Sequence, residues 1–247
     1  MEYDGTGYAG FQRLTRRKGA GAGHAAGPPS IQETLETALG QVLGAPVQAL
    51  GAGRTDAGAH ARGQVVAWDG DWRHGPDALL RALNATLPED IVLRELAEAA
   101  PGFHPRFDAR SRTYEYTLYV APVRPALGRQ YAWHRWEGLD AEALRAAAER
   151  LVGEHDFATF GQPTRGEVTV RRVMRAEWHV RPPYWIFEIE ANAFLQRMVR
   201  SLVGTLRAVG ARELSVDGFA EVLAAADRRR SGPAAPAHGL CLTRVTY

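Results

Sequence analysis

The order of expected helices and strands repeats along this chain, and that repeat constrains the fold more than any other feature. In each half, hydrophobic periodicity predicts a strand, a helix, two strands, a helix and a final strand, with one extra helix late in the second half. This βαββαβ order is the ferredoxin-like unit. We therefore expect an α+β fold of two ferredoxin-like units, 1–103 and 104–247. They would share a largely antiparallel sheet with helices packed on it and a cleft between the units.

Several segments carry clear start or stop signals. Ser30 and Glu33 form a capping box that predicts a helix as far as Leu43, and Pro76 is typical of a first helical position. Alternating or β-branched runs and amphipathic runs predict the remaining elements. The expected strands are 47–50, 63–68, 91–96, 112–120, 168–180, 184–191 and 239–247, and the other expected helices are 140–152, 194–209 and 216–226.

Two segments near the start depart from this regular pattern. Residues 15–29 are basic and rich in Gly, Ala and Pro, which indicates a mobile loop. Only Met1 to Asp4 precede Gly5, fewer residues than the ~5–6 of an average strand. The first strand of a ferredoxin-like unit is interior and paired on both sides, so we expect the natural protein to begin upstream of Met1.

Composition excludes several classes of protein. The single cysteine, Cys241, allows no intramolecular disulfide and no cysteine-based metal cage, and favours a reducing cytoplasm. No run approaches the ~20 apolar residues of a membrane helix, and no pair of histidines has the spacing of metal ligands.

The basic residues are unevenly placed. All but Lys18 of the 30 basic residues are arginines. Six arginines fall within 104–135, and four fall within 194–212, where there is no acid. Locally positive segments in a chain of net charge +2 indicate a polyanionic partner on one face, although such runs are more often solvated surface.

The segment most suggestive of chemistry is GAGRTDAGAHARG at 51–63. It lacks the third glycine of a dinucleotide-binding loop and the Lys-Ser/Thr pair of a phosphate-binding loop. It does present one carboxylate, Asp56, beside Arg54 in a backbone that glycines allow to bend. An aspartate in such a turn is more often a turn former than a catalyst, so both hypotheses stay open on these residues alone.

Ordered blocks across the chain resemble the tRNA pseudouridine synthase A family. They are EYDGTGYAGFQ at 2–12, GAGRTDAGAHARGQV at 51–65, FHPRFDARSRTYEYTLY at 103–119, GEHDFATF at 153–160 and NAFLQRMVRSLVGTLRAVG at 192–210. Together they span nearly the whole chain. The resemblance implies an enzyme that isomerises uridines 38, 39 and 40 in the anticodon stem-loop of tRNA. It also implies a homodimer that needs no metal or cofactor.

Four residues take roles from this resemblance. Asp56 matches the catalytic aspartate, and Arg200 matches the arginine that pairs with it. Tyr114 matches the tyrosine that stacks on the target base, and Arg54 an arginine that holds the base out of the helix. Tyr116 would project from the same strand face as Tyr114, and we expect one of the two to be core.

Phe194, Met198 and Leu202 lie on one helical stripe and are expected to be core, while Arg197 and Arg207 are expected at the surface.

A non-catalytic tRNA-binding protein is the main alternative function. A zinc deaminase is excluded, since one cysteine cannot supply its ligands.

Overall fold

The computed structural model describes residues 1–13, 27–163 and 166–247. Within these ranges the chain is α+β, with five α-helices and strands that pair mostly antiparallel. It divides into two compact units, unit 1 (Met1–Ala109 with Tyr247) and unit 2 (Arg110–Thr246). Apart from 27–29, the loop expected at 15–29 lies outside the described residues. Among the helices described, none is long and apolar enough to cross a membrane.

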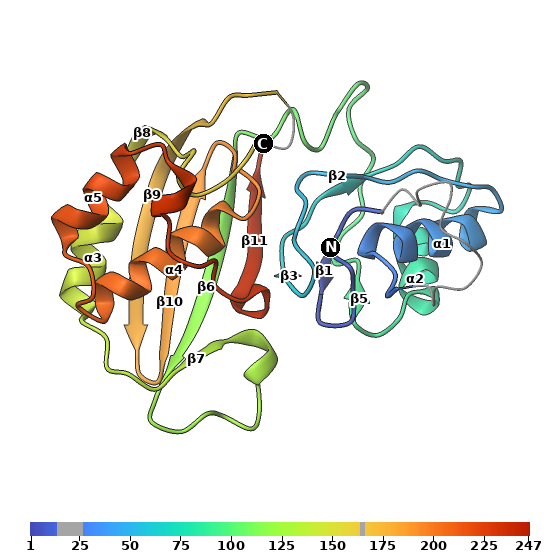
Figure 1. Cartoon of the computed structure of the whole chain (residues 1–247). Helices are drawn as coiled ribbons and strands as arrows, with labels where there is room; N and C mark the ends of the chain where they lie inside the picture. The colour runs from blue at the N-terminus through green and yellow to red at the C-terminus, as the bar shows by residue number, and fades with distance from the viewer. Residues whose placement is uncertain (14–26, 164–165) are drawn as a thin grey trace, which may run out of the picture. The chain divides into compact units, whose positions relative to one another are not determined.

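Unit 1 is built on strands of two residues each (Figure 1). β1 lies between β3 and β5 and pairs antiparallel with both, which confirms that the first strand is interior. β2 pairs antiparallel with β4. The bounds are β1 Glu2–Tyr3, β2 Leu50–Gly51, β3 His60–Ala61, β4 Val66–Ala67 and β5 Ile91–Val92.

The strands predicted in unit 1 were too long, and β3 was predicted as loop. β3 forms because Ala61 pairs with Tyr3 from the other end of the unit. A glycine-rich segment carries no alternating pattern that would reveal such pairing in advance.

The two helices of unit 1 follow their start signals. α1 (Ile31–Leu43) begins after Ser30, whose side chain accepts a hydrogen bond from the Glu33 N–H at 3.1 Å. It ends at Gly44, which has a left-handed φ of 74°. α2 (Pro76–Thr86) begins at its proline. Both predicted helices are confirmed.

Unit 2 contains a larger antiparallel sheet with strand order β11-β6-β10-β9-β8. The short β7 adds to β6 in parallel. The long strands match their predictions closely, whereas β7 and β8 were missed because three or four residues carry too little periodicity. The bounds are β6 Ser111–Val120, β7 Trp133–Arg135, β8 Gly153–Asp156, β9 Val170–Arg181, β10 Tyr184–Ala191 and β11 Leu240–Thr246.

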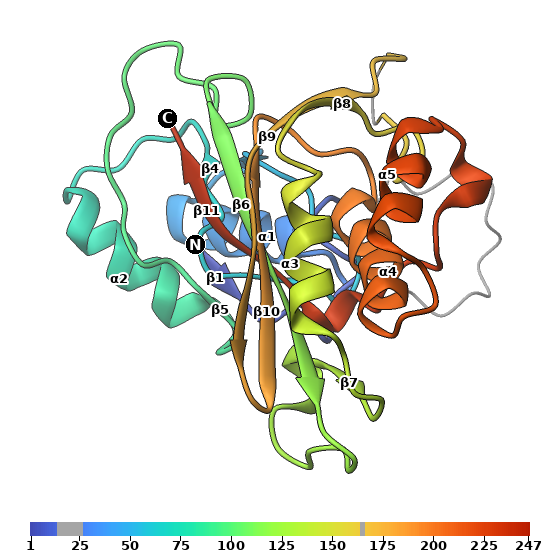
Figure 2. The ribbon, with the colours of Figure 1, turned by 90° about the vertical axis from the view of Figure 1, so that its left-hand side faces the viewer.

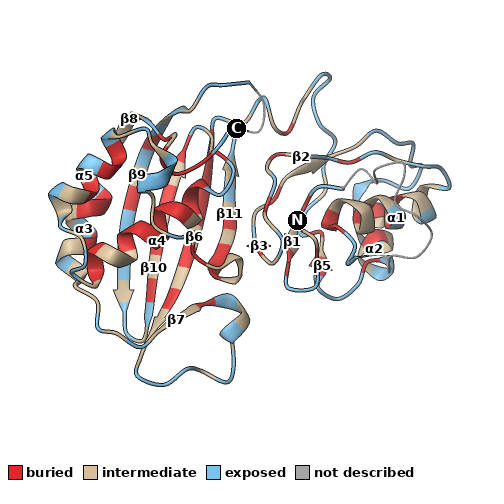
Figure 3. Cartoon of the chain, viewed as in Figure 1, coloured by how far each residue is buried: buried red, intermediate tan, exposed pale blue. Residues whose placement is uncertain are grey.

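Three helices cover one face of this sheet, as Figure 2 shows from the side. They are α3 (Ala141–Glu149), α4 (Met198–Gly210) and α5 (Val216–Ala224). Every second residue of β10 is buried beneath them, and Figure 3 shows this buried layer between sheet and helices. Short 3₁₀ turns lie at Arg129–Tyr131, Arg228–Arg230 and Ala237–Gly239.

α4 begins four residues later than predicted. Arg197 has a left-handed φ of 62° and precedes the helix, so Phe194 is not helical. Met198 and Leu202 are buried as expected. The core role expected for Phe194 is corrected, because it is only partly buried and lies ahead of the helix.

Candidate active site

Asp56 lies in the loop 51–63 of unit 1, which we call the Asp56 loop. The side chain of Gln64, which is buried, holds one limb of this loop with two hydrogen bonds. The Gly53 N–H donates to Gln64 Oε1 at 3.2 Å, and Gln64 Nε2 donates to the Gly53 carbonyl at 3.0 Å. These bonds satisfy both main-chain groups of Gly53, and they therefore fix the path of the backbone that leads to Asp56.

The N-terminal segment holds the centre of the same loop. The Phe11 N–H donates to the Thr55 carbonyl at 3.1 Å. The Tyr3 hydroxyl and Thr55 Oγ1 are 2.8 Å apart in a buried hydrogen bond. Thr55 is therefore fixed through both its main chain and its side chain, immediately before Asp56.

Two glycines of the N-terminal segment allow this close packing. Gly10 has a φ of 98°, and a Cβ added there would lie 2.8 Å from the Thr55 carbonyl oxygen. A Cβ added at Gly5 would lie 1.9 Å from the Ala59 carbonyl oxygen. Side chains cannot fit at either position without moving the loop. The sequence blocks at 2–12 and 51–65 thus form one packed structure around Asp56.

Asp56 itself lies in a tight turn and is partly exposed. Its carbonyl accepts a hydrogen bond from the Ala59 N–H at 3.1 Å, and Gly58 has a left-handed φ of 81°. The main chain thus closes the turn at Asp56.

Arg54 is exposed, two residues before Asp56. Partial burial of its guanidinium, and then the nearby charge of Arg106, lower the pKa of Arg54 from its ordinary value. It remains a cation at neutral pH. A bound anion would reduce the repulsion between the cations of Arg54 and Arg106. This part of unit 1 is therefore suited to bind a phosphate group.

Tyr114 lies in the middle of β6, in unit 2. It pairs in register with Ile189 of β10 and Leu242 of β11 and is only 7% exposed. Its ring makes a T-shaped contact with Phe194, with centroids 5.0 Å apart and planes at 82°. Phe194 therefore fixes the ring of Tyr114 from the segment that leads into α4.

Tyr116 is the core member of the tyrosine pair. It is fully buried, and its hydroxyl donates to the Pro236 carbonyl at 2.7 Å. A Cβ added at Gly239 would lie 2.6 Å from the Tyr116 ring. The expectation that one of the two tyrosines packs in the core is confirmed for Tyr116.

Arg200 lies in the first turn of α4 and is half-buried. Its Nε donates to the Ala235 carbonyl at 2.7 Å, and its own carbonyl accepts from the Ala235 N–H at 2.9 Å. Arg207, two turns later, was expected at the surface, but its side chain is only 17% exposed; it is bound to the exposed Glu213 at 2.6 Å. The two arginines of one helix are thus held in different ways.

The structure places the four expected site residues on two units. Arg54 and Asp56 share one loop of unit 1, and Tyr114 and Arg200 belong to unit 2. Sequence reasoning missed three supporting residues, Gln64, Phe194 in its contact with Tyr114, and Ala235. Gln64 and Phe194 stand inside the quoted sequence blocks, so a signal was present, whereas nothing in the sequence marks Ala235.

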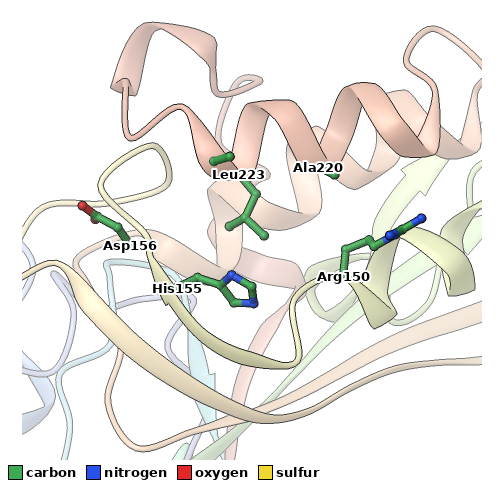
Figure 4. Close-up of a pocket in the computed structure, with 6 residues that line it drawn as sticks. Arg150, His155, Asp156, Ala220 and Leu223 are labelled. Carbon is green, nitrogen blue, oxygen red and sulfur yellow. The ribbon is translucent and has the colours of Figure 1, made fainter.

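A separate hollow lies in unit 2, between α5 and the segment from the end of α3 to β8 (Figure 4). Its volume is about 340 Å³. None of the four expected site residues lines it. The lining residues are Arg150, His155, Asp156, Ala220, Leu223 and Ala224.

Known proteins resemble this chain along its whole length. A family model described as tRNA pseudouridine synthase matches residues 147–247. The tRNA pseudouridine synthase A of Moorella thermoacetica is 40% identical over 250 residues, covering 100% of this chain and 97% of that protein. The proteins of the same name from Xanthomonas euvesicatoria pv. vesicatoria and Geobacter sp. (strain M21) are 43% and 39% identical. They too match 100% of this chain, which covers 93% and 96% of them.

Proposed function

Because this chain belongs to the tRNA pseudouridine synthase A family, we propose that it isomerises uridine to pseudouridine in tRNA, at positions 38, 39 and 40 of the anticodon stem-loop. The full-length similarity to proteins of that name carries this proposal. The fixed Asp56 loop supports it, since a catalytic group must be held in one geometry.

The reaction breaks the bond from C1′ to N1 and forms a bond from C1′ to C5. N1 gains a proton and C5 loses one, so nothing is oxidised or hydrolysed. An ionised Asp56 performs this as a nucleophile at C1′ or as the base that removes a sugar proton. Neither route requires a metal or a cofactor.

The other three residues act on the same uridine. The base must leave its stack before a carboxylate reaches the glycosidic bond. Arg54 holds the extruded nucleotide, and the neighbouring charge of Arg106 suits its phosphate. Tyr114 stacks on the base, which is worth ~1–3 kcal/mol. Arg200 pairs with Asp56 and orients its carboxylate.

The finer architecture is part of this proposal. The order β11-β6-β10-β9, with α3 and α4 as crossovers, is the arrangement of a ferredoxin-like unit, and it supports that assignment for unit 2. We assign the catalytic loop to the first unit, and the basic segments that face RNA to the second. The enzyme acts in the cytoplasm, where tRNA is modified.

We further propose that the enzyme is a twofold homodimer whose affinity for tRNA falls steeply with salt. Sedimentation at micromolar concentration should give the mass of two chains, about twice 27.0 kDa. A fully active monomer under those conditions would refute the proposed dimer, while the proposed reaction would still stand.

Mapping pseudouridine after incubation with unmodified tRNA tests the function. Carbodiimide labelling followed by primer extension should reveal pseudouridine at positions 38 to 40 and at no other position. Tight binding of tRNA without any pseudouridine would favour the alternative, a tRNA-binding protein without catalysis.

A further inference from the structure

The segment 227–239, between α5 and β11, lies along α4, and we call it the strap (Figure 1). Four positions of α4 contact it, at the spacing of one helix face. Each makes a different kind of contact, so the strap is held at several points between Arg228 and Ala235. The four positions are Arg200, Ser201, Gly204 and Thr205.

Gly204 lets the strap approach the helix axis. A Cβ added there would lie 1.8 Å from the Pro233 carbonyl oxygen. A glycine inside a helix costs about 1 kcal/mol relative to alanine. The close passage of the strap gives that glycine a structural reason.

Hydrogen bonds fix the strap on both sides of this glycine. Arg228 donates to the Thr159 carbonyl at 3.0 Å and to Ser201 Oγ at 3.2 Å, and both of these partners are fully buried. Further along, the Gly232 N–H donates to Thr205 Oγ1 at 3.0 Å. Thr205 is itself only 2% exposed, so this bond has no competition from water.

The later part of the strap contacts Arg200 and the core residue Tyr116. Ala235 makes its reciprocal pair of hydrogen bonds with Arg200. The carbonyl of the next residue, Pro236, accepts a hydrogen bond from the hydroxyl of Tyr116, which lies two residues after Tyr114 on β6. An arginine side chain is long and mobile, and a bond to its Nε fixes the rotation of the planar guanidinium.

We propose that the strap is the device that positions Arg200 for catalysis, with Arg228 and Thr205 as positioning residues that act through Ala235. This inference rests on the proposed role of Arg200. Arg207 on the same helix provides the contrast. Its Nη1 donates to the carboxylate of the exposed Glu213, a side-chain partner in place of a main-chain carbonyl.

The test replaces Thr205 by Val, which keeps the shape and removes the hydroxyl. The Gly232 N–H then loses its acceptor, the strap shifts, and the single-turnover rate should fall about ten- to a hundredfold. The dissociation constant for tRNA should change less than about twofold, since phosphate contacts dominate binding. Thr205→Ser restores the hydroxyl and should restore the rate.

Two controls separate positioning from stability. Thr205 Oγ1 donates to the Ser201 carbonyl at 2.9 Å on α4, and Thr37 Oγ1 donates to the Glu33 carbonyl at 2.8 Å on α1. Thr37→Val therefore removes the same kind of helix bond and should leave the rate unchanged. In an Arg200→Met background, Thr205→Val should cause no further loss of rate, because the group it positions is gone. A merely structural effect would instead multiply with that of Arg200→Met.

The possible results separate the proposed role of the strap from the proposed role of Arg200. Full activity of Arg200→Met would overturn the proposed role of Arg200. A large loss of rate in Arg200→Met, together with the wild-type rate in both Thr205→Val and Arg228→Met, would overturn only the proposal that the strap positions Arg200. Multiplying losses in the double variant would also overturn it.

Discussion

Unit 1 and unit 2 hold their site residues by different means. In unit 1 the strands have only two residues each, and the Asp56 loop is held by main-chain hydrogen bonds and by glycines packed against carbonyls. In unit 2 a long strand and a helix carry Tyr114 and Arg200, and aromatic and side-chain-to-carbonyl contacts fix them. Short strands offer few paired groups, so close backbone packing takes over where a sheet is small.

The close packing of glycines against the Asp56 loop predicts that one added methyl group will displace this loop. Gly10→Ala places a Cβ 2.8 Å from the Thr55 carbonyl oxygen at a left-handed φ. The Asp56 loop must move, and a displacement near 1 Å lowers the rate by about a hundredfold. The measurement is the single-turnover rate of pseudouridine formation.

Gly7→Ala is the matched control, since nothing lies within 4 Å of a Cβ added at Gly7. Its rate should equal that of the wild type. Equal rates for Gly10→Ala and Gly7→Ala would show that backbone packing does not hold the loop.

In unit 2 the sensitive element is an aromatic ring. Tyr114→Leu keeps a buried apolar side chain but removes the flat face, so the single-turnover rate should fall about ten- to a hundredfold, as expected for a loss of ~1–3 kcal/mol of stacking. Initial tRNA binding should change much less, because stacking follows flipping. Tyr184→Leu, at an exposed tyrosine at the start of β10, serves as the control and should keep its activity. An unchanged rate in Tyr114→Leu would contradict the proposal that Tyr114 stacks on the base.

The smallest effect concerns charge at the start of the strap. Hydrogen bonds from Arg229 lower the pKa of Asp227 to about 2. A carboxylate with a depressed pKa stabilises the folded state above its unfolded pKa of about 3.9, and this contribution is lost as the pH falls through about 2.

Comparison of the wild type with Asp227→Asn isolates this effect. The wild type should be slightly more stable to unfolding at pH 5, and the two should converge near pH 2. A difference that is independent of pH would show that the Asp227 charge is not responsible.

The sequence predicted those elements whose signals are local. Ser30 and Glu33 determined the start of α1, and alternation along β6, β9 and β10 predicted long strands. β3 depends on pairing with Tyr3, 58 positions earlier in its register with Ala61, and no local pattern encodes it. The late start of α4 depends on the left-handed φ of Arg197, which an arginine rarely adopts.

The same distinction applies to the site. Asp56, Arg54, Tyr114 and Arg200 are proposed as site residues through sequence blocks that resemble a family. On its own residues, Asp56 would have remained a candidate turn former. The bonds that hold them could not be predicted in this way. Arg200 and Ala235 are 35 positions apart, and a main-chain carbonyl can belong to any residue type. Long-range contacts to the backbone leave no trace in composition or periodicity.

The central claim is that the carboxylate of Asp56 performs the isomerisation. Asp56→Asn keeps nearly the same shape and removes the charge, and single-turnover assays with unmodified tRNA measure the consequence. We expect the rate to fall by about 10²- to 10⁴-fold or more, with the dissociation constant for tRNA within about twofold of the wild type. Turnover in Asp56→Asn within about tenfold of the wild-type rate would contradict the claim.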